Sequence, residues 1–202
     1  MAKRLRGRYG YPKEDPFKPI FHEDRINEPF DLYEPSRIFV SSMGDLFGEW
    51  VDEETILRVI GVALFNPRHT FLFLTKNPKR YEQFDFPQNC WLGYSSEGDI
   101  YYRFTAQQQE KNLTFISIEP LIEEPKNLQN LEWTDWIIMG AETGNRKEKI
   151  ATDPEWVNQI MKAKKKQAVF IKDSILKDYD LSNEDKKHYQ GIPYVWLCGE
   201  KR

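Results

Sequence analysis

Short apolar runs alternate along the chain with polar segments of helical spacing. The runs are rich in β-branched and aromatic residues, which favour strands. Six predicted strands can be counted: Arg37 to Ser42, Thr70 to Lys76, Cys90 to Ser95, Thr114 to Glu119, Trp136 to Ala141, and Ala168 to Asp173. Their apolar positions are continuous rather than alternating, which indicates strands covered on both faces in a parallel sheet.

The segments between the runs predict helices. Negative charge at Asp52 to Glu54 precedes apolar residues at helical spacing, and Asn66-Pro67 ends this first helix. A second helix is predicted over Tyr101 to Glu110. A third follows Asp153-Pro154, where an N-cap aspartate precedes a proline at the first helical position.

Two further segments have weaker patterns. Asn77 to Gln88 predicts a short helix, with Tyr81 and Phe84 packing inward. Pro120 to Glu132 contains two prolines and predicts a loop with one helical turn.

Strands that alternate with helices predict an α/β fold, and here a partial TIM-type (β/α) barrel of about six parallel strands with intervening helices. The 202 residues suit a single domain over 1–202 with one core. Hydrophobic residues make up 40% and charged residues 30%, which is typical of a folded globular protein rather than a disordered one.

Polar residues follow every predicted strand, at the end where ligands bind in parallel α/β folds. One polar residue in such a place is more often a cap or turn former. Six strand ends in succession favour a ligand site instead. The candidate ligand-binding residues are Ser42, Asp45, Thr75, Lys76, Ser95, Ser117, Glu119, Glu142 and Lys172.

Glu119 and Glu142 are the strongest candidates among these residues. A carboxylate at a barrel mouth is able to hold a ribose hydroxyl or an amine, or to act as a general base. Lys172 either pairs with one of them or contacts the ligand, and the sequence leaves both roles open. The glycine-rich stretch from Gly140 to Gly144 permits close backbone approach but is not a phosphate-binding loop.

Charge and cysteine content narrow the function classes further. The net charge of -3 gives no overall attraction to nucleic acid, so nucleic-acid binding depends on a local basic run: Lys3, Arg4, Arg6 and Arg8. A solvated basic helix end is the more common meaning of such a run. Cys90 and Cys198 lie far apart, which predicts buried thiols and no metal site, while His69 is expected to be structural. No segment has the roughly 20 apolar residues of a membrane span, so we expect a cytoplasmic protein.

The blocks RIFVSSMGDLFGEWV, HTFLFLTKNPKRY, NCWLGYSSE, TFISIEPLI, DWIIMGAETG and AVFIKDSIL resemble a phage-associated protein family of unknown function. Members of that family have a three-cysteine motif and look like radical S-adenosylmethionine proteins. The resemblance covers roughly Met1 to Leu176, and its most specific blocks are SMGDLF and SIEPL.

The resemblance implies S-adenosylmethionine or a related nucleotide as the ligand at the strand ends. It implies a 4Fe–4S cluster only in a longer form with upstream cysteines, because the opening residues look like the helix that follows the cysteine motif. A missing first strand would expose a sheet edge for a partner protein or a second copy to cover.

Three functions therefore remain open. The first is a ligand-binding barrel of radical-S-adenosylmethionine type. The second is a non-enzymatic module that binds nucleic acid or protein. The third is a cofactor-free hydrolase or lyase that uses Glu119, Glu142 and Lys172, although the sequence identifies no catalytic residue.

Overall fold

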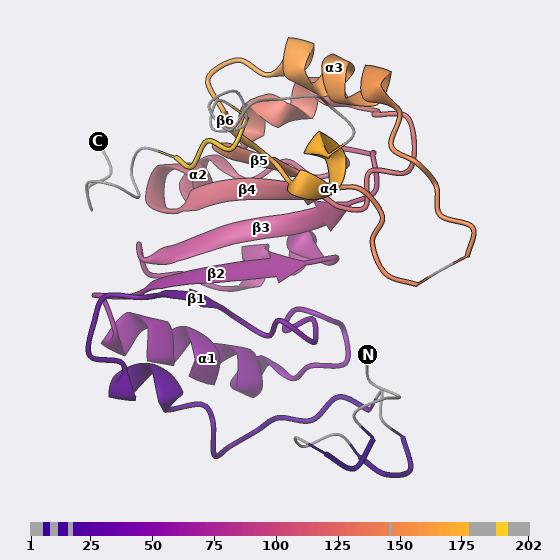
Figure 1. Cartoon of the computed structure of the whole chain (residues 1–202). Coiled ribbons are helices and arrows are strands. Elements are labelled where there is room, and N and C mark those ends of the chain that lie inside the picture. The colour runs from indigo at the N-terminus through magenta and orange to yellow at the C-terminus, as the bar shows by residue number, and fades with distance from the viewer. Residues whose placement is uncertain (1–5, 9–11, 16–17, 146, 178–188, 194–202) are drawn as a thin grey trace.

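The computed structural model describes residues 6–8, 12–15, 18–145, 147–177 and 189–193. Six parallel strands lie in the order of the sequence and form a curled half-barrel with interspersed helices, which confirms the predicted fold class (Figure 1). The strands are β1 (Arg37–Phe39), β2 (Thr70–Thr75), β3 (Cys90–Ser96), β4 (Leu113–Ile118), β5 (Trp136–Met139) and β6 (Ala168–Ile171).

Within the described residues, four α-helices and three 3-10 helices connect or flank these strands. They are η2 (Glu28–Asp31), α1 (Glu53–Phe65), η3 (Pro78–Gln83), α2 (Ala106–Lys111), η4 (Leu128–Trp133), α3 (Pro154–Ala163) and α4 (Asp173–Leu176). The predicted caps are confirmed, since Asp52 accepts a hydrogen bond from the Thr55 amide at 2.7 Å and Asp153 accepts one from the Glu155 amide at 2.8 Å. These caps satisfy amides that a helix start leaves without a partner.

The helix predicted over Tyr101 to Glu110 was too long. It begins at Ala106, because Thr105 and Gln108 form a capping box in which each side chain bonds the other residue's backbone. Upstream of this cap, Tyr102 and Phe104 are buried between exposed neighbours, so the segment has the two-residue period of an extended chain.

The strand ends also differ from the predicted ones, by one to three residues, and two of these differences have a clear cause. β1 stops at Phe39 rather than Ser42, because Ser41 has a φ of 53° and turns the chain away from the sheet. β6 stops at Ile171 because Asp173 begins α4, a helix that the sequence pattern did not predict.

The sheet has two different faces. On the convex face, strand residues pack with α1 and α3 in the main core: Phe71, Phe73, Leu92, Tyr94, Ile116, Ile118, Ile137, Met139, Ile56, Ile60, Val157 and Ile160. The concave face has a second cluster of Trp91, Leu113, Phe115 and Trp136, against which Leu72, Leu74, Ile138, Ala168 and Phe170 are partly buried. In the described part of the chain, the continuous apolar runs therefore do not have helices on both sides. Their second face is the inside of the half-barrel.

Gly93 in β3 fixes the packing of the concave face. A Cβ atom there would lie 2.2 Å from the Phe115 ring, so the absence of a side chain lets that ring lie across β3. Trp136 then packs against Phe115 at 5.8 Å and against Trp91 at 6.0 Å between ring centroids. These aromatic rings fill the part of the concave face near the amino ends of the strands.

We predict that Gly93→Ala destabilises the fold. The added methyl group overlaps the Phe115 ring, and overpacking of this kind costs about 1–3 kcal/mol. Urea denaturation followed by circular dichroism measures the change, and Phe115→Leu in the same chain should recover part of it. Gly44→Ala is the control, because a Cβ atom at Gly44 meets nothing within 4 Å. Equal unfolding midpoints for Gly93→Ala and Gly44→Ala would contradict this account.

Candidate functional site

The carboxyl ends of β4, β5 and β6 lie side by side because their backbone hydrogen bonds continue past the strands. The Gly140 amide donates to the Ile118 carbonyl at 3.1 Å, and the Lys172 amide donates to the Met139 carbonyl at 2.9 Å. Residues that directly follow three different strands are thereby held at one edge of the half-barrel.

Glu119 and Lys172 form an ion pair across this edge, with the Lys172 ammonium donating to Glu119 Oε2. The Glu119 carboxylate passes over Gly140, where a Cβ atom would lie 2.8 Å from Glu119 Oε1. Gly140 therefore makes room for the carboxylate between the two flanking strands. The structure thus settles one open question, because Lys172 does pair with a predicted carboxylate. Its side chain is still 42% exposed and that of Glu119 is 29% exposed, so a ligand is able to reach both.

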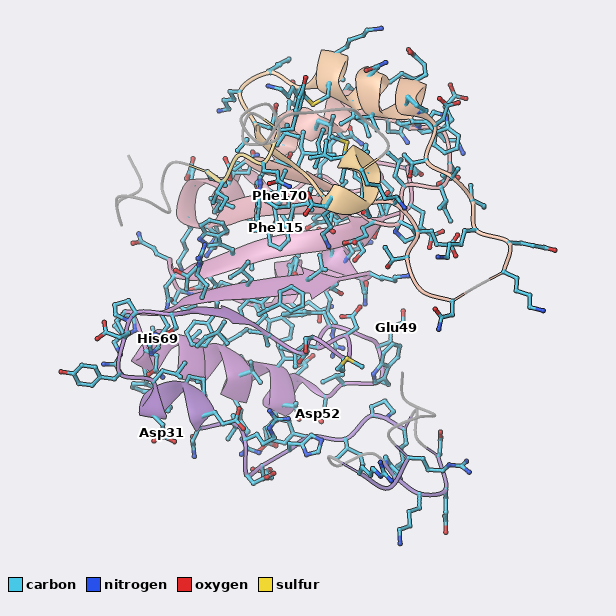
Figure 2. All side chains as sticks on the ribbon, viewed as in Figure 1. Asp31, Glu49, Asp52, His69, Phe115 and Phe170 are labelled. Carbon is cyan, nitrogen blue, oxygen red and sulfur yellow. The ribbon has the colours of Figure 1, made fainter. Side chains whose placement is uncertain are left out.

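Ser117 and the aromatic residues below it extend the site toward the strand interior. Phe115, Ser117 and Glu119 occupy alternate positions and so share the concave face. Phe115 and Phe170 both belong to the concave cluster and lie on the same side of the sheet (Figure 2). We call Phe115, Ile138 and Phe170 on this face the apolar floor of the site. The sequence did not predict it, although the two-residue spacing from Phe115 to Glu119 is present there.

Asp45 and Thr75 hold the loops that follow β1 and β2 through hydrogen bonds to backbone amides. Asp45 accepts hydrogen bonds from the Phe47 amide at 3.0 Å and the Lys76 amide at 2.8 Å, which ties the loop after β1 to the end of β2. Thr75 is buried, and its hydroxyl accepts from the Asn77 amide at 2.9 Å. The Lys76 ammonium lies 4.0 Å from Glu97 Oε1 at the surface.

The remaining candidates, Ser42, Ser95 and Glu142, lie in or beside the loops that follow β1, β3 and β5. Ser42 is exposed in the turn after β1. The Ser95 carbonyl accepts from the Tyr101 hydroxyl at 3.4 Å. Glu142 accepts from the Ile150 amide at 3.1 Å and so closes its own loop. Among the predicted residues, the structure brings Glu119 and Lys172 into contact, and Ser117 lies on β4, two residues before Glu119.

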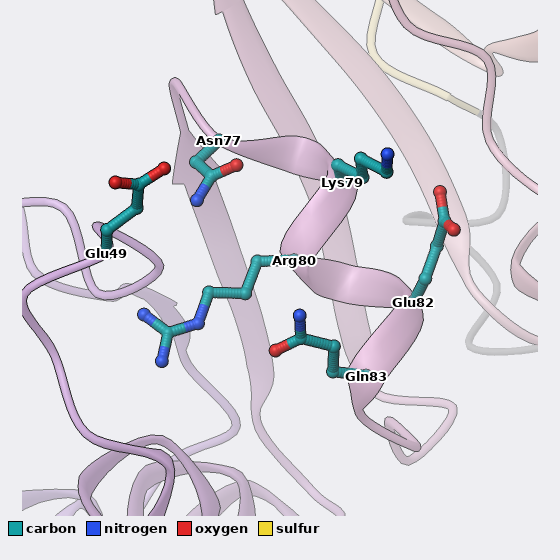
Figure 3. Close-up of a pocket in the computed structure, with 6 residues that line it drawn as sticks. All are labelled: Glu49, Asn77, Lys79, Arg80, Glu82 and Gln83. Atoms are coloured by element: carbon teal, nitrogen blue, oxygen red, sulfur yellow. The ribbon is translucent and has the colours of Figure 1, made fainter.

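A cleft of about 440 Å³ lies between η3 and the loop after β1, away from these three residues. Its lining residues are Glu49, Asn77, Lys79, Arg80, Glu82 and Gln83. Asn77 and Arg80 extend toward the loop that carries Glu49 (Figure 3). The Arg80 guanidinium donates to the Gly48 carbonyl and, at 2.5 Å, to the Val51 carbonyl, so it holds this loop in place.

The described residues do not fit an iron–sulfur cluster. Such a cluster with an open iron needs three thiolates close together. Within the described ranges, no three His, Cys, Asp or Glu side chains gather as metal ligands. Cys90 is buried at the start of β3, and burial raises the pKa of its thiol, while Cys198 lies outside the described residues.

Other predicted features lie at the periphery. Arg6 donates to the Glu14 carbonyl at 3.2 Å and Arg8 is exposed, while Lys3 and Arg4 lie outside the described residues. Nucleic-acid binding therefore stays a prediction. His69 is buried and its Nδ1 accepts from the Ser36 amide at 3.0 Å, which supports a structural role. Among the described residues, none of the helices has both the length and the apolar character of a membrane span.

Comparison with known proteins identifies the family. A family model described as "Protein of unknown function (DUF5131)" matches residues 1–175. The chain belongs to the DUF5131 family. Searches of curated proteins and of solved structures found no match. Membership in DUF5131 confirms that the chain is similar to a family of unknown function, whereas the phage association and the cysteine motif stay predictions.

We predict that Cys90 of this DUF5131 protein is unreactive in the folded state. Its burial and raised pKa suppress the thiolate, which is the form that attacks disulfide reagents. In a Cys198→Ser background, the rate of reaction with a chromogenic disulfide should rise on the order of 100-fold when urea unfolds the chain. Equal rates in the folded and unfolded states would contradict this burial.

Proposed function

We propose that the concave carboxyl edge of the half-barrel binds S-adenosylmethionine or a closely related nucleoside. The observation that carries this proposal is the Glu119–Lys172 pair, which is fitted over Gly140 and remains partly exposed above an apolar floor. The family resemblance supports the same ligand class.

The two charged residues complement an amino-acid group. The α-amino group of S-adenosylmethionine is able to donate to the Glu119 carboxylate, and its α-carboxylate is able to accept from the Lys172 ammonium. Ribose hydroxyls are alternative donors to the same carboxylate. One ion pair in the free protein thus presents both charges that a zwitterionic ligand needs.

The apolar floor complements the rest of the ligand. Phe170 and Ile138 are only partly buried on the concave face, which leaves surface for a nucleobase to pack against. A sulfonium cation is also attracted to the face of an aromatic ring. The ligand would therefore have its polar end at Glu119 and Lys172 and its apolar surface toward Phe170.

Opening the ion pair to admit the ligand requires little free energy. Fully exposed ion pairs contribute about 0–1 kcal/mol, and water still reaches both partners of this partly exposed pair. Contacts of Glu119 and Lys172 with the ligand then replace the contact between the two side chains. The proposal concerns binding and includes no radical step, because the described residues provide no cluster ligands.

The first test is calorimetric titration of the purified chain with S-adenosylmethionine. We expect saturable binding to one site, and we expect Glu119→Gln and Lys172→Met each to raise Kd by about 10–100-fold through loss of a charged hydrogen bond. The matched controls are Glu132→Gln and Lys165→Met, which break a surface ion pair of 3.0 Å elsewhere on the chain.

Either of two results would contradict the proposal that this edge binds S-adenosylmethionine. The first is an absence of binding heat from a chain whose circular dichroism shows an intact fold. The second is an equal loss of affinity in the Glu132 and Lys165 controls.

The second test uses Gly140→Ala. The new methyl group meets the flexible end of Glu119, so we expect it to displace the carboxylate and raise Kd by about tenfold with a nearly unchanged melting temperature. In a double-mutant cycle with Glu119→Gln, the two effects should not add, because both act on the same carboxylate. Additive effects would show that Gly140 does not act through Glu119.

A further inference from the structure

Helix α1 has large apolar residues on both of its sides, and Arg58 on the outward side pairs with Glu23. Ile56, Ile60 and Ala63 are buried on the side that packs on the sheet. On the opposite side Leu57, Leu64 and Phe65 are 55%, 58% and 74% exposed. A surface helix normally presents polar residues to solvent, whereas the outward side of α1 exposes three large apolar side chains beside Arg58. We therefore expect another protein surface to pack on the outward side of α1.

Gly61 lies at the centre of this outward side. At about 3.6 residues per turn, it falls between Leu57 and Phe65 on the helix surface. A Cβ atom at Gly61 would meet nothing within 4 Å, so the packing of the chain itself does not require glycine there. Glycine is unfavourable in a helix interior compared with alanine. It does allow another helix backbone to approach closely.

A neighbouring segment widens the apolar surface. η2 lies beside α1 (Figure 1), and the chain after it reaches the end of α1, where the Arg68 guanidinium donates to the Leu32 carbonyl. Tyr33 in this segment is 87% exposed. The exposed apolar surface thus extends beyond one side of a single helix.

The charges around this surface are self-complementary. Glu54 lies in the first turn of α1 and Arg68 lies just beyond its last residue, and both are exposed. Their positions are symmetric in sequence about Gly61, and so are those of Leu57 and Phe65. Two copies of α1 that cross antiparallel at Gly61 would therefore place Glu54 near Arg68 of the other copy and Leu57 near its Phe65.

We propose that the outward side of α1 is the interface of a homodimer with two-fold symmetry, centred on Gly61. A two-fold interface uses the same surface of both copies, which is what the symmetric placement of charges and apolar residues provides. The antiparallel crossing also places each helix amino terminus near the other's carboxyl terminus, where the helix dipoles attract. Because α1 packs on the convex face, the ligand edge on the concave face stays open in the dimer.

Sedimentation equilibrium of the full chain over micromolar concentrations tests the dimer. We expect the unmodified chain to dimerise, and we expect Gly61→Gln and Phe65→Glu each to raise the dimer Kd by about 100-fold. The control is Trp50→Glu, which changes a side chain that is 66% exposed outside α1 and should leave the dimer intact. Circular dichroism checks that each variant is folded.

Charge reversal tests the antiparallel register. Glu54→Arg and Arg68→Glu should each weaken the dimer by about threefold to tenfold, and the double variant should restore it because opposite charges face each other again. In a Cys198→Ser background, Gly61→Cys should form an intermolecular disulfide on oxidation, since the two cysteines meet at the two-fold axis. The proposal is overturned by a chain that stays monomeric, by a dimer that survives both Gly61→Gln and Phe65→Glu, or by charge reversals that do not compensate.

Discussion

Each strand of the sheet pairs in parallel with the strand that follows it in sequence, and the rest of the structure depends on this pairing. Parallel connections of this kind have a strong preference for one hand, so successive crossovers place their helices on the same side of the sheet. A sheet with helices on one side curls, and its other side becomes a concave surface. The main core and the concave cluster follow from that division.

The same pairing assembles the candidate site from distant parts of the chain. Glu119 and Lys172 are 53 positions apart in sequence, and they meet because only β5 lies between the two strands that directly precede them. Gly140 lies between them without a side chain, so the carboxylate is able to cross. A half-barrel leaves the pair partly open to solvent, and this exposure makes a ligand role compatible with a structural ion pair.

Helix α1 contributes to the core through one side only. Its inward residues complete the main core, while Leu57, Leu64 and Phe65 on its outward side stay exposed beside Arg58, which pairs with Glu23. The ligand edge and the outward side of α1 therefore carry separate interactions. One depends on residues at the carboxyl ends of β4 to β6, and the other depends on the helix that connects β1 to β2.

Local patterns in the sequence were enough to predict six strands, the caps at Asp52 and Asp153, and an α/β fold with polar residues at the strand ends. These depend on neighbouring residues, so their patterns are visible in one chain. Strand order and register were needed to show that Asp45 accepts from the Lys76 amide at the end of β2 and that Lys172 pairs with Glu119. Those outcomes depend on strand order and register, which bring together residues that no local pattern relates.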